Sequence, residues 1–154
     1  MTMSSLAIID KIYAASGLED ILIESETVAS GSLNGVLSGR MYNRGIRSHK
    51  LLYEALGRMQ VLEFMESLEE ETRDDYVARL HGYITNFGKD RVITDELFDI
   101  CEAFEEHKLQ REAESPIYVL WNSYTTMVQL LLSFLRGTRE SNWQLHLSSL
   151  KMML

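Results

Sequence analysis

The sequence contains very little cysteine, proline and glycine: one cysteine (Cys101), one proline (Pro116) and nine glycines in 154 residues. A single cysteine excludes an intramolecular disulfide. An all-β protein needs many turns, and this chain has few of the residues that make them. Hydrophobic residues at 45% and charged residues at 25% are typical of a globular chain. The composition therefore predicts a helical domain with a core large enough to fold without disulfides or metal.

The sequence also lacks the common catalytic and cofactor-binding motifs. It has no GxSxG, P-loop or GxGxxG segment. Its histidines form neither an HExxH motif nor an i, i+4 pair; they are His49, His81, His107 and His146. The acidic residues Glu19, Asp20, Glu24 and Glu26 leave a divalent-cation site open as an alternative to a solvent-exposed connection. We assign no catalytic, cofactor-binding or metal residues and expect no cofactor.

Residues 116–135 carry no charge, yet they predict a core helix rather than a membrane span. A polar stripe at i, i+4, i+7 and i+11 is formed by Asn122, Thr126, Gln129 and Ser133. The opposite face is apolar and carries Leu120, Tyr124, Met127, Leu131, Phe134 and Leu135. The first apolar patch, residues 6–9, is too short for a signal peptide. We expect a cytoplasmic or nuclear chain with no membrane partner.

Hydrophobic periodicity predicts an all-α fold: an irregular bundle of about six helices with one long extended connection near residues 18–31. The predicted helices cover residues 5–16, 40–70, 72–87, about 94–114, 116–137 and 141–154, with a short additional helix at 32–37. Within the connection, residues 21–23 are compatible with one brief strand. Predicted N-caps are Thr94, Ser115 and Ser141, the last in a capping box with Gln144. We expect a single helical domain over residues 1–154.

The predicted helix at 40–70 has a wet face and a packed face. The wet face carries Arg40, Arg44, Arg47, Leu51 and Arg58. The packed face carries Tyr42, Ile46, His49, Tyr53 and Leu56. After Gly57 the apolar line is displaced, so we expect the helix to bend or to change its packing partner there.

The basic residues Arg40, Arg44, Arg47 and Lys50, hereafter the basic face, are the main functional candidate in a chain of net charge −8. Guanidinium groups one helical turn apart match successive phosphates, which indicates an anion or nucleic-acid contact. The alternative is structural, with the basic face forming ion pairs with acidic helices downstream.

The last predicted helix carries an apolar line that continues to the last residue of the sequence. Trp143, Leu147, Leu150 and Leu154 repeat at i, i+4, i+7 and i+11. We expect this face to bind a protein partner or to mediate self-association, and we expect the chain to be an incomplete piece of a larger protein.

Two sequence blocks carry a family resemblance. Residues 36–56 follow the pattern V-L-x-G-R-x-Y-N-R-x-x-R-x-H-K-L-x-Y-E-A-L, and residues 120–147 follow L-W-x-S-Y-x-x-M-V-x-L-L-L-x-F-x-R-x-x-R-x-x-N-W-x-L-H-L. Together they resemble a multi-copy, uncharacterised, mobile-element-like family of animal proteins. The resemblance implies no catalytic residue.

From these observations we expect a helical interaction or structural fragment with no catalytic activity of its own. The alternative hypothesis is a nucleic-acid or anion contact module of a mobile-element-derived protein, acting through residues 40–50.

Overall fold

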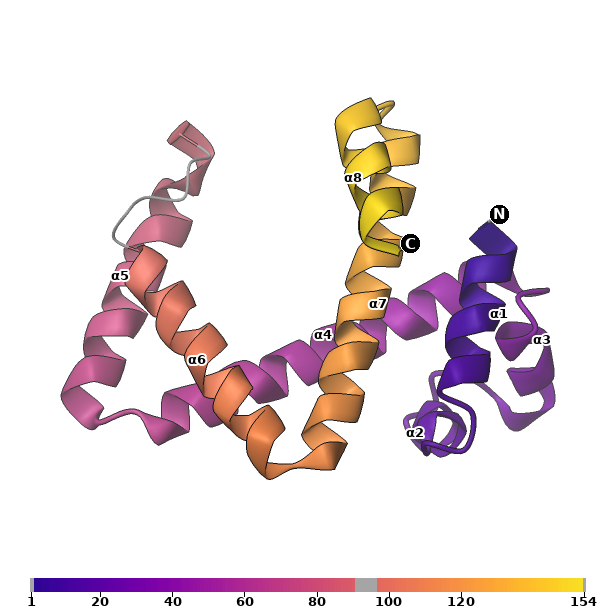
Figure 1. Ribbon diagram of the computed structural model, residues 1–154, viewed down its shortest axis with the longest axis horizontal. Coiled ribbons are helices and arrows are strands. Elements are labelled where there is room, and N and C mark those ends of the chain that lie inside the picture. Colours follow the sequence, from indigo (N-terminus) through magenta and orange to yellow (C-terminus); the bar gives the residue numbers. More distant parts are fainter. Residues whose placement is uncertain (1, 91–96, 154) are drawn as a thin grey trace. The chain divides into compact units, whose positions relative to one another are not determined.

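The computed structural model describes residues 2–90 and 97–153, which contain helices and no strand (Figure 1). The described residues form eight α-helices: α1 (Thr2–Ile12), α2 (Leu18–Glu24), α3 (Leu33–Leu37), α4 (Tyr42–Ser67), α5 (Glu70–Asp90), α6 (Phe98–Glu114), α7 (Pro116–Arg139) and α8 (Trp143–Met153). A 3-10 helix, η1 (Ser30–Ser32), precedes α3. The all-α prediction is confirmed, with eight helices in the described residues rather than about six.

The chain divides into two compact units. Unit 1 consists of Met1–Leu56 and Leu120–Leu154, and unit 2 consists of Gly57–Val119. α4 runs without a break through the boundary, belonging to unit 1 up to Leu56 and to unit 2 from Gly57. The expected change of packing partner at Gly57 is therefore confirmed.

The predicted extended connection at residues 18–31 is wrong, because most of it is helical. α2 covers Leu18–Glu24, and the brief strand considered for residues 21–23 lies inside it. Leu18 and Leu22, one turn apart, are each 1% exposed, so burial of this apolar pair stabilises a helix of only seven residues. Gly17 precedes it with φ 89°, a left-handed conformation that glycine adopts at no steric cost.

The core of unit 1 joins α1, α2, α3 and α7. Its buried apolar residues are Leu6, Ile9, Tyr13, Leu18, Leu22, Val28, Val36, Tyr124, Val128, Leu131, Phe134 and Leu135. The predicted packed face of α4 borders this core through Ile46, Tyr53 and Leu56. The predicted wet face is exposed, as expected from the helical repeat.

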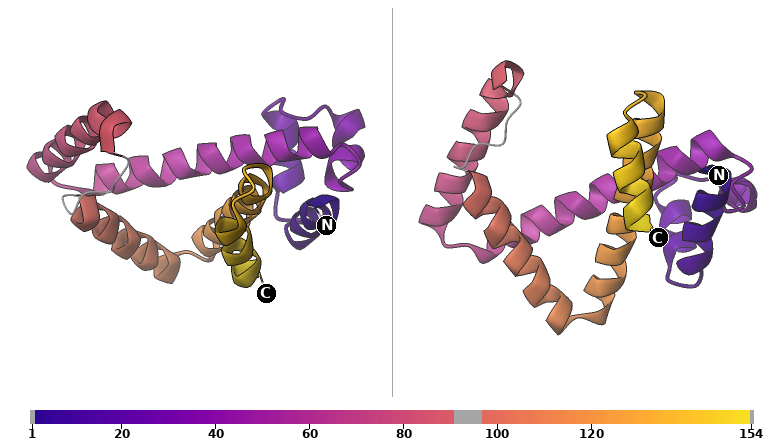
Figure 2. Two further views of the ribbon diagram at one scale, coloured as in Figure 1. Left: turned by 90° about the horizontal axis from the view of Figure 1, so that it is seen from above. Right: turned by 45° about the horizontal axis from the view of Figure 1, so that its top comes forward.

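α7 and α8 lie side by side as an antiparallel pair in both views of Figure 2. The predicted start of α7 is confirmed, because the Ser115 hydroxyl accepts a hydrogen bond from the Tyr118 amide at 3.3 Å and Pro116 is the first helical residue. At Gly137 a Cβ would lie 2.8 Å from the His146 amide nitrogen, so the close approach of the two helices requires glycine there. The apolar face predicted for α7 is buried or partly buried.

The N-cap predicted for α8 is wrong by one residue. Asn142, rather than Ser141, is the N-cap, since its Oδ1 accepts a hydrogen bond from the Leu145 amide at 3.0 Å. Ser141 has φ 54° and lies in the turn before the cap. The predicted cap Thr94 lies outside the described residues.

Unit 2 has a small aromatic core. Phe64 of α4 is 3% exposed, and its ring lies 5.3 Å from Phe104 of α6 and 6.4 Å from Tyr76 of α5, measured between centroids. Arg111 of α6 also forms an ion pair with Glu63 at 2.7 Å.

No helix within the described residues is long and apolar enough to cross a membrane.

Candidate functional site

The basic face lies at the start of α4 and in the turn before it. Arg44, Arg47 and Lys50 are on α4, and all three are exposed. Arg40 precedes the helix, which begins at Tyr42 rather than at Arg40 as predicted. The Arg40 Nε donates a hydrogen bond to the Ser38 hydroxyl at 3.0 Å. The helical repeat therefore places three of the four cations, while the α3–α4 turn places the fourth.

None of the four cations forms an ion pair with a described residue of unit 1. Arg44 has one weak contact, from its Nη1 to the Ser32 hydroxyl at 3.5 Å. Guanidinium and ammonium groups without a carboxylate partner keep their full attraction for an added anion. The structural alternative, ion pairs with the acidic helices downstream, concerns residues of unit 2 and stays open.

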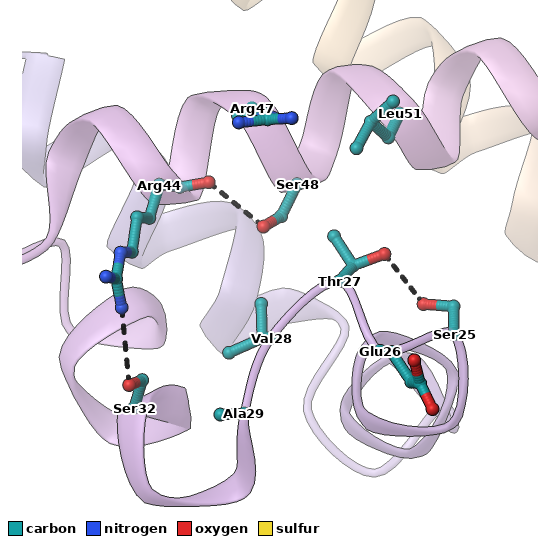
Figure 3. Close-up of a pocket in the computed structure, with 10 residues that line it drawn as sticks. All are labelled: Ser25, Glu26, Thr27, Val28, Ala29, Ser32, Arg44, Arg47, Ser48 and Leu51. Carbon is teal, nitrogen blue, oxygen red and sulfur yellow. Dashed lines mark hydrogen bonds between the residues drawn. The ribbon is translucent and has the colours of Figure 1, made fainter.

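Arg44 and Arg47 line a pocket of about 450 Å³ between α4 and the turn that follows α2 (Figure 3). The turn contributes one wall and α4 the other; the lining residues are Ser25, Glu26, Thr27, Val28, Ala29, Ser32, Arg44, Arg47, Ser48 and Leu51. Arg44 and Ser48 extend from α4 toward the turn, while Thr27 and Val28 extend from the turn toward α4 (Figure 3). This volume is within the range of small-ligand sites in proteins.

The pocket is rich in hydrogen-bond donors. Ser48 donates to the Arg44 carbonyl at 2.9 Å, and the Ser25 and Thr27 hydroxyls lie 2.8 Å apart. The backbone amides of Thr27 and Ala29 have no acceptor among the described residues. Glu26 is the one acidic residue that lines the pocket, and it is exposed. The Ser48, Ser25 and Thr27 hydroxyls are engaged in these bonds, so the two cations, the Ser32 hydroxyl and the two amides are the donors that suit an oxyanion.

The turn forms this wall because it folds back on α2. The Val28 amide donates to the Leu22 carbonyl at 3.0 Å, and Val28 is 5% exposed. Sequence reasoning placed Arg44 and Arg47 on one face but missed the opposite wall. The only sequence signal for that wall was the cluster of hydroxyl residues at 25–32.

The acidic residues considered for a cation site do not form one in the described residues. Glu19, Asp20 and Glu24 lie on α2, and Glu26 lies in the turn after it. No group of three or more His, Cys, Asp or Glu side chains in the described part of the chain is placed to hold a metal ion.

A buried polar network joins three helices of unit 1, and sequence reasoning placed His49 and Tyr124 on packed helix faces but missed Asp10. His49 of α4 is 1% exposed, and its Nδ1 lies 2.7 Å from the Tyr124 hydroxyl of α7. Its Nε2 lies 3.3 Å from Oδ1 of Asp10 of α1, without hydrogen-bond alignment. The prediction of His49 as a core residue is confirmed. The sequence signal for Asp10 was a carboxylate directly after the apolar residues 6–9.

The predicted apolar line on α8 is exposed in part. Trp143 is 68% exposed and Leu147 is 47% exposed, whereas Leu150 packs against the core of unit 1. Leu154 lies outside the described residues. The Trp143 ring stacks on His146 with centroids 5.4 Å apart and an 11° angle between planes. Binding of a partner at this face stays a prediction.

The fold and the site define an all-helical protein with an exposed basic face beside a donor-rich pocket. The chain belongs to the family described as "Domain of unknown function (DUF8702)", whose model matches residues 1–154. No curated protein and no solved structure matches the chain.

Proposed function

We propose that this chain is a helical contact module, without catalytic activity of its own, that binds the phosphate groups of nucleic acid through the basic face. The observation that carries the proposal is that Arg40, Arg44, Arg47 and Lys50 are exposed and make no ion pair with the described residues of unit 1. Phosphate contacts of this kind give affinity without sequence specificity.

Charge and resemblance support the proposal further. The net charge of −8 repels a polyanion from most of the surface, so an attractive contact has to be confined to a small region of positive charge. The basic face is such a region. The resemblance of residues 36–56 and 120–147 to mobile-element-like animal proteins agrees with a role on nucleic acid. A nuclear or cytoplasmic location is part of this proposal.

The test is binding of a fluorescently labelled oligonucleotide, followed by anisotropy over a series of salt concentrations. Each neutralised phosphate adds about 0.7 to 0.9 to the slope of log affinity against log salt, so Arg44→Glu with Arg47→Glu lowers that slope by about 1 to 2. Arg44→Glu and Arg47→Glu are also measured singly, and their matched control is Arg139→Glu, since Arg139 is an exposed arginine of α7 that does not line the pocket. Absence of binding at low salt, or an equal effect of the control, would refute the proposal.

A second candidate function is self-association of two copies through α8. The observation that favours it is the exposed apolar pair Trp143 and Leu147 on a helix whose sequence contains no acidic residue. Two copies of a chain with net charge −8 repel each other at most surfaces, and an acid-free face avoids that repulsion.

A further inference from the structure

We propose that the pocket between α4 and the turn at residues 25–32 binds a single phosphate monoester through Arg44 and Arg47. This inference rests on the proposed function because the two arginines also belong to the basic face. It adds a distinct site, since Arg40 and Lys50 do not line the pocket while Arg44 and Arg47 do.

The two walls of the pocket supply complementary parts of a phosphate site. α4 contributes the two guanidinium groups, which form charge-assisted hydrogen bonds with phosphate oxygens. The turn contributes the Ser32 hydroxyl and the amides of Thr27 and Ala29, which have no acceptor among the described residues. The Ser25 and Thr27 hydroxyls bond to each other, and Ser25 also donates to the Leu22 carbonyl at 3.4 Å. The weak 3.5 Å contact between Arg44 and Ser32 is readily exchanged for a contact with an anion placed between them (Figure 3).

The charge and shape of the pocket favour a terminal phosphate over the phosphodiester of a continuous strand. A phosphate monoester carries a charge of about −1.5 to −2 near neutral pH and offers three terminal oxygens, whereas each phosphodiester carries one charge. Two cations and several donors match the dianion better. Arg40 and Lys50 are exposed outside the pocket, where they can contact the phosphates of a continuous strand.

Glu26 predicts the direction in which a charge substitution in the pocket changes phosphate affinity. Its carboxylate is the one acidic group lining the pocket, and it makes no ion pair with a described residue. Its charge therefore opposes anion binding. Neutralising it with Glu26→Gln, which keeps the side-chain length, should tighten phosphate binding by about two- to fivefold, the range for one exposed charge pair.

The experiment is calorimetric titration of the full chain with adenosine 5′-monophosphate, inorganic phosphate, adenosine and cyclic adenosine monophosphate, which is a diester. Arg44→Ala and Arg47→Ala should each weaken binding of the monophosphate by at least about tenfold, as expected for a hydrogen bond to a charged group. Thr27→Val with Ser32→Ala alters the turn while keeping all four cations. It should weaken monophosphate binding several-fold and leave oligonucleotide binding unchanged.

Lys50→Ala is the converse control, since Lys50 belongs to the basic face but does not line the pocket. It should weaken oligonucleotide binding and leave monophosphate binding unchanged. A chain that binds the monophosphate but no oligonucleotide keeps this proposal and ends the proposed function. Circular dichroism of each variant checks that the helices are intact.

The remaining outcomes either identify the source of the phosphate or contradict the proposal. Binding of inorganic phosphate but not of the nucleotide assigns the pocket to free phosphate, and the reverse assigns it to an organic monoester; both retain the dianion site. Four results would each overturn the proposal. The first two are equal affinity for the cyclic diester and monophosphate binding that survives Arg44→Ala with Arg47→Ala. The other two are weaker monophosphate binding in Glu26→Gln and no binding of any phosphate compound.

Discussion

Tyr124 is the residue on which the buried network of unit 1 depends. Its side chain is fully buried, and its ring packs edge-on against Tyr13 at 5.2 Å and Trp121 at 5.7 Å. Burial, with a contribution from the Asp10 charge, raises the pKa of Tyr124 well above its ordinary value of 10.0, so the hydroxyl keeps its proton. His49 Nδ1 is the one acceptor for that proton among the described residues. The Tyr124 hydroxyl and His49 Nδ1 therefore depend on each other for a hydrogen-bond partner in the core.

Tyr124→Phe tests this arrangement. The substitution removes the donor and leaves a buried ring nitrogen without a partner, which should lower the free energy of unfolding by about 1 to 3 kcal/mol. The measurement is urea denaturation followed by circular dichroism.

Tyr13→Phe is the matched control for this prediction. Tyr13 is 2% exposed, but its hydroxyl donates to Ser123, which is itself exposed and reaches water. The expected loss is about 0.5 to 1 kcal/mol, since the Ser123 acceptor stays solvated. A loss in Tyr124→Phe no larger than that in Tyr13→Phe would show that His49 does not depend on the Tyr124 hydroxyl.

At the scale of elements, the sequence predicts those helices whose signals are local. Ser115 and Pro116 mark the start of α7 correctly because capping and the missing proline amide act within one turn. The N-cap of α8 lies one residue later than predicted because Asn142 competes with Ser141 for the same role, and spacing alone cannot rank two adjacent caps. α2 was missed because its helical signal is one buried pair, Leu18 and Leu22, whose burial depends on the rest of unit 1.

One wall of the candidate site can be predicted from the sequence, and the other cannot. The side shared by Arg44 and Arg47 follows from the helical repeat, so sequence alone predicts it. The wall at residues 25–32 depends on the return of the chain over α2, fixed by the hydrogen bond from the Val28 amide to the Leu22 carbonyl. That return depends on tertiary packing and leaves no periodic pattern in the sequence, so the pocket could not be predicted.

The ion pair between α5 and α6 gives unit 2 a predictable response to acid. Arg79 of α5 donates through both terminal nitrogens to Asp99 of α6, and this lowers the pKa of Asp99 below its ordinary value of 3.8. A lowered pKa in the folded state means that the stabilisation is complete above the ordinary value and is lost as pH falls through the lowered value. The response should therefore occur in the acid range, below the ordinary value of 3.8.

Asp99→Asn should remove this part of the acid response. We expect amide exchange in α5 and α6 to accelerate less on acidification in the variant than in the parent chain, because the variant has already lost the ionised partner of Arg79. The control is Asp74→Asn, since Asp74 is exposed on α5 and makes no ion pair among the described residues. An identical pH dependence in Asp99→Asn and the parent chain would contradict the assignment.

At the scale of the whole molecule, two parts of the described chain differ from its overall acidic charge. The net charge is −8, yet the sequence of α8 contains no acidic residue and the basic face has no carboxylate paired to it in the described part of unit 1. An acidic chain stays dispersed through self-repulsion, so contacts form where that repulsion is weakest. The basic face suits an anion, and the exposed side of α8 suits an uncharged surface.

Self-association through α8 is the prediction that belongs to this scale. Trp143 stacks on His146 and is 68% exposed, so it presents an aromatic surface of the kind that dominates interface energy. Sedimentation equilibrium should show reversible association of the parent chain, and Trp143→Ser with Leu147→Ser should raise the dissociation constant by at least about tenfold. Leu109→Ser is the control, since Leu109 is 65% exposed on α6 outside this face. A parent chain that stays monomeric at every concentration, or a control that dissociates equally, would rule α8 out as the contact.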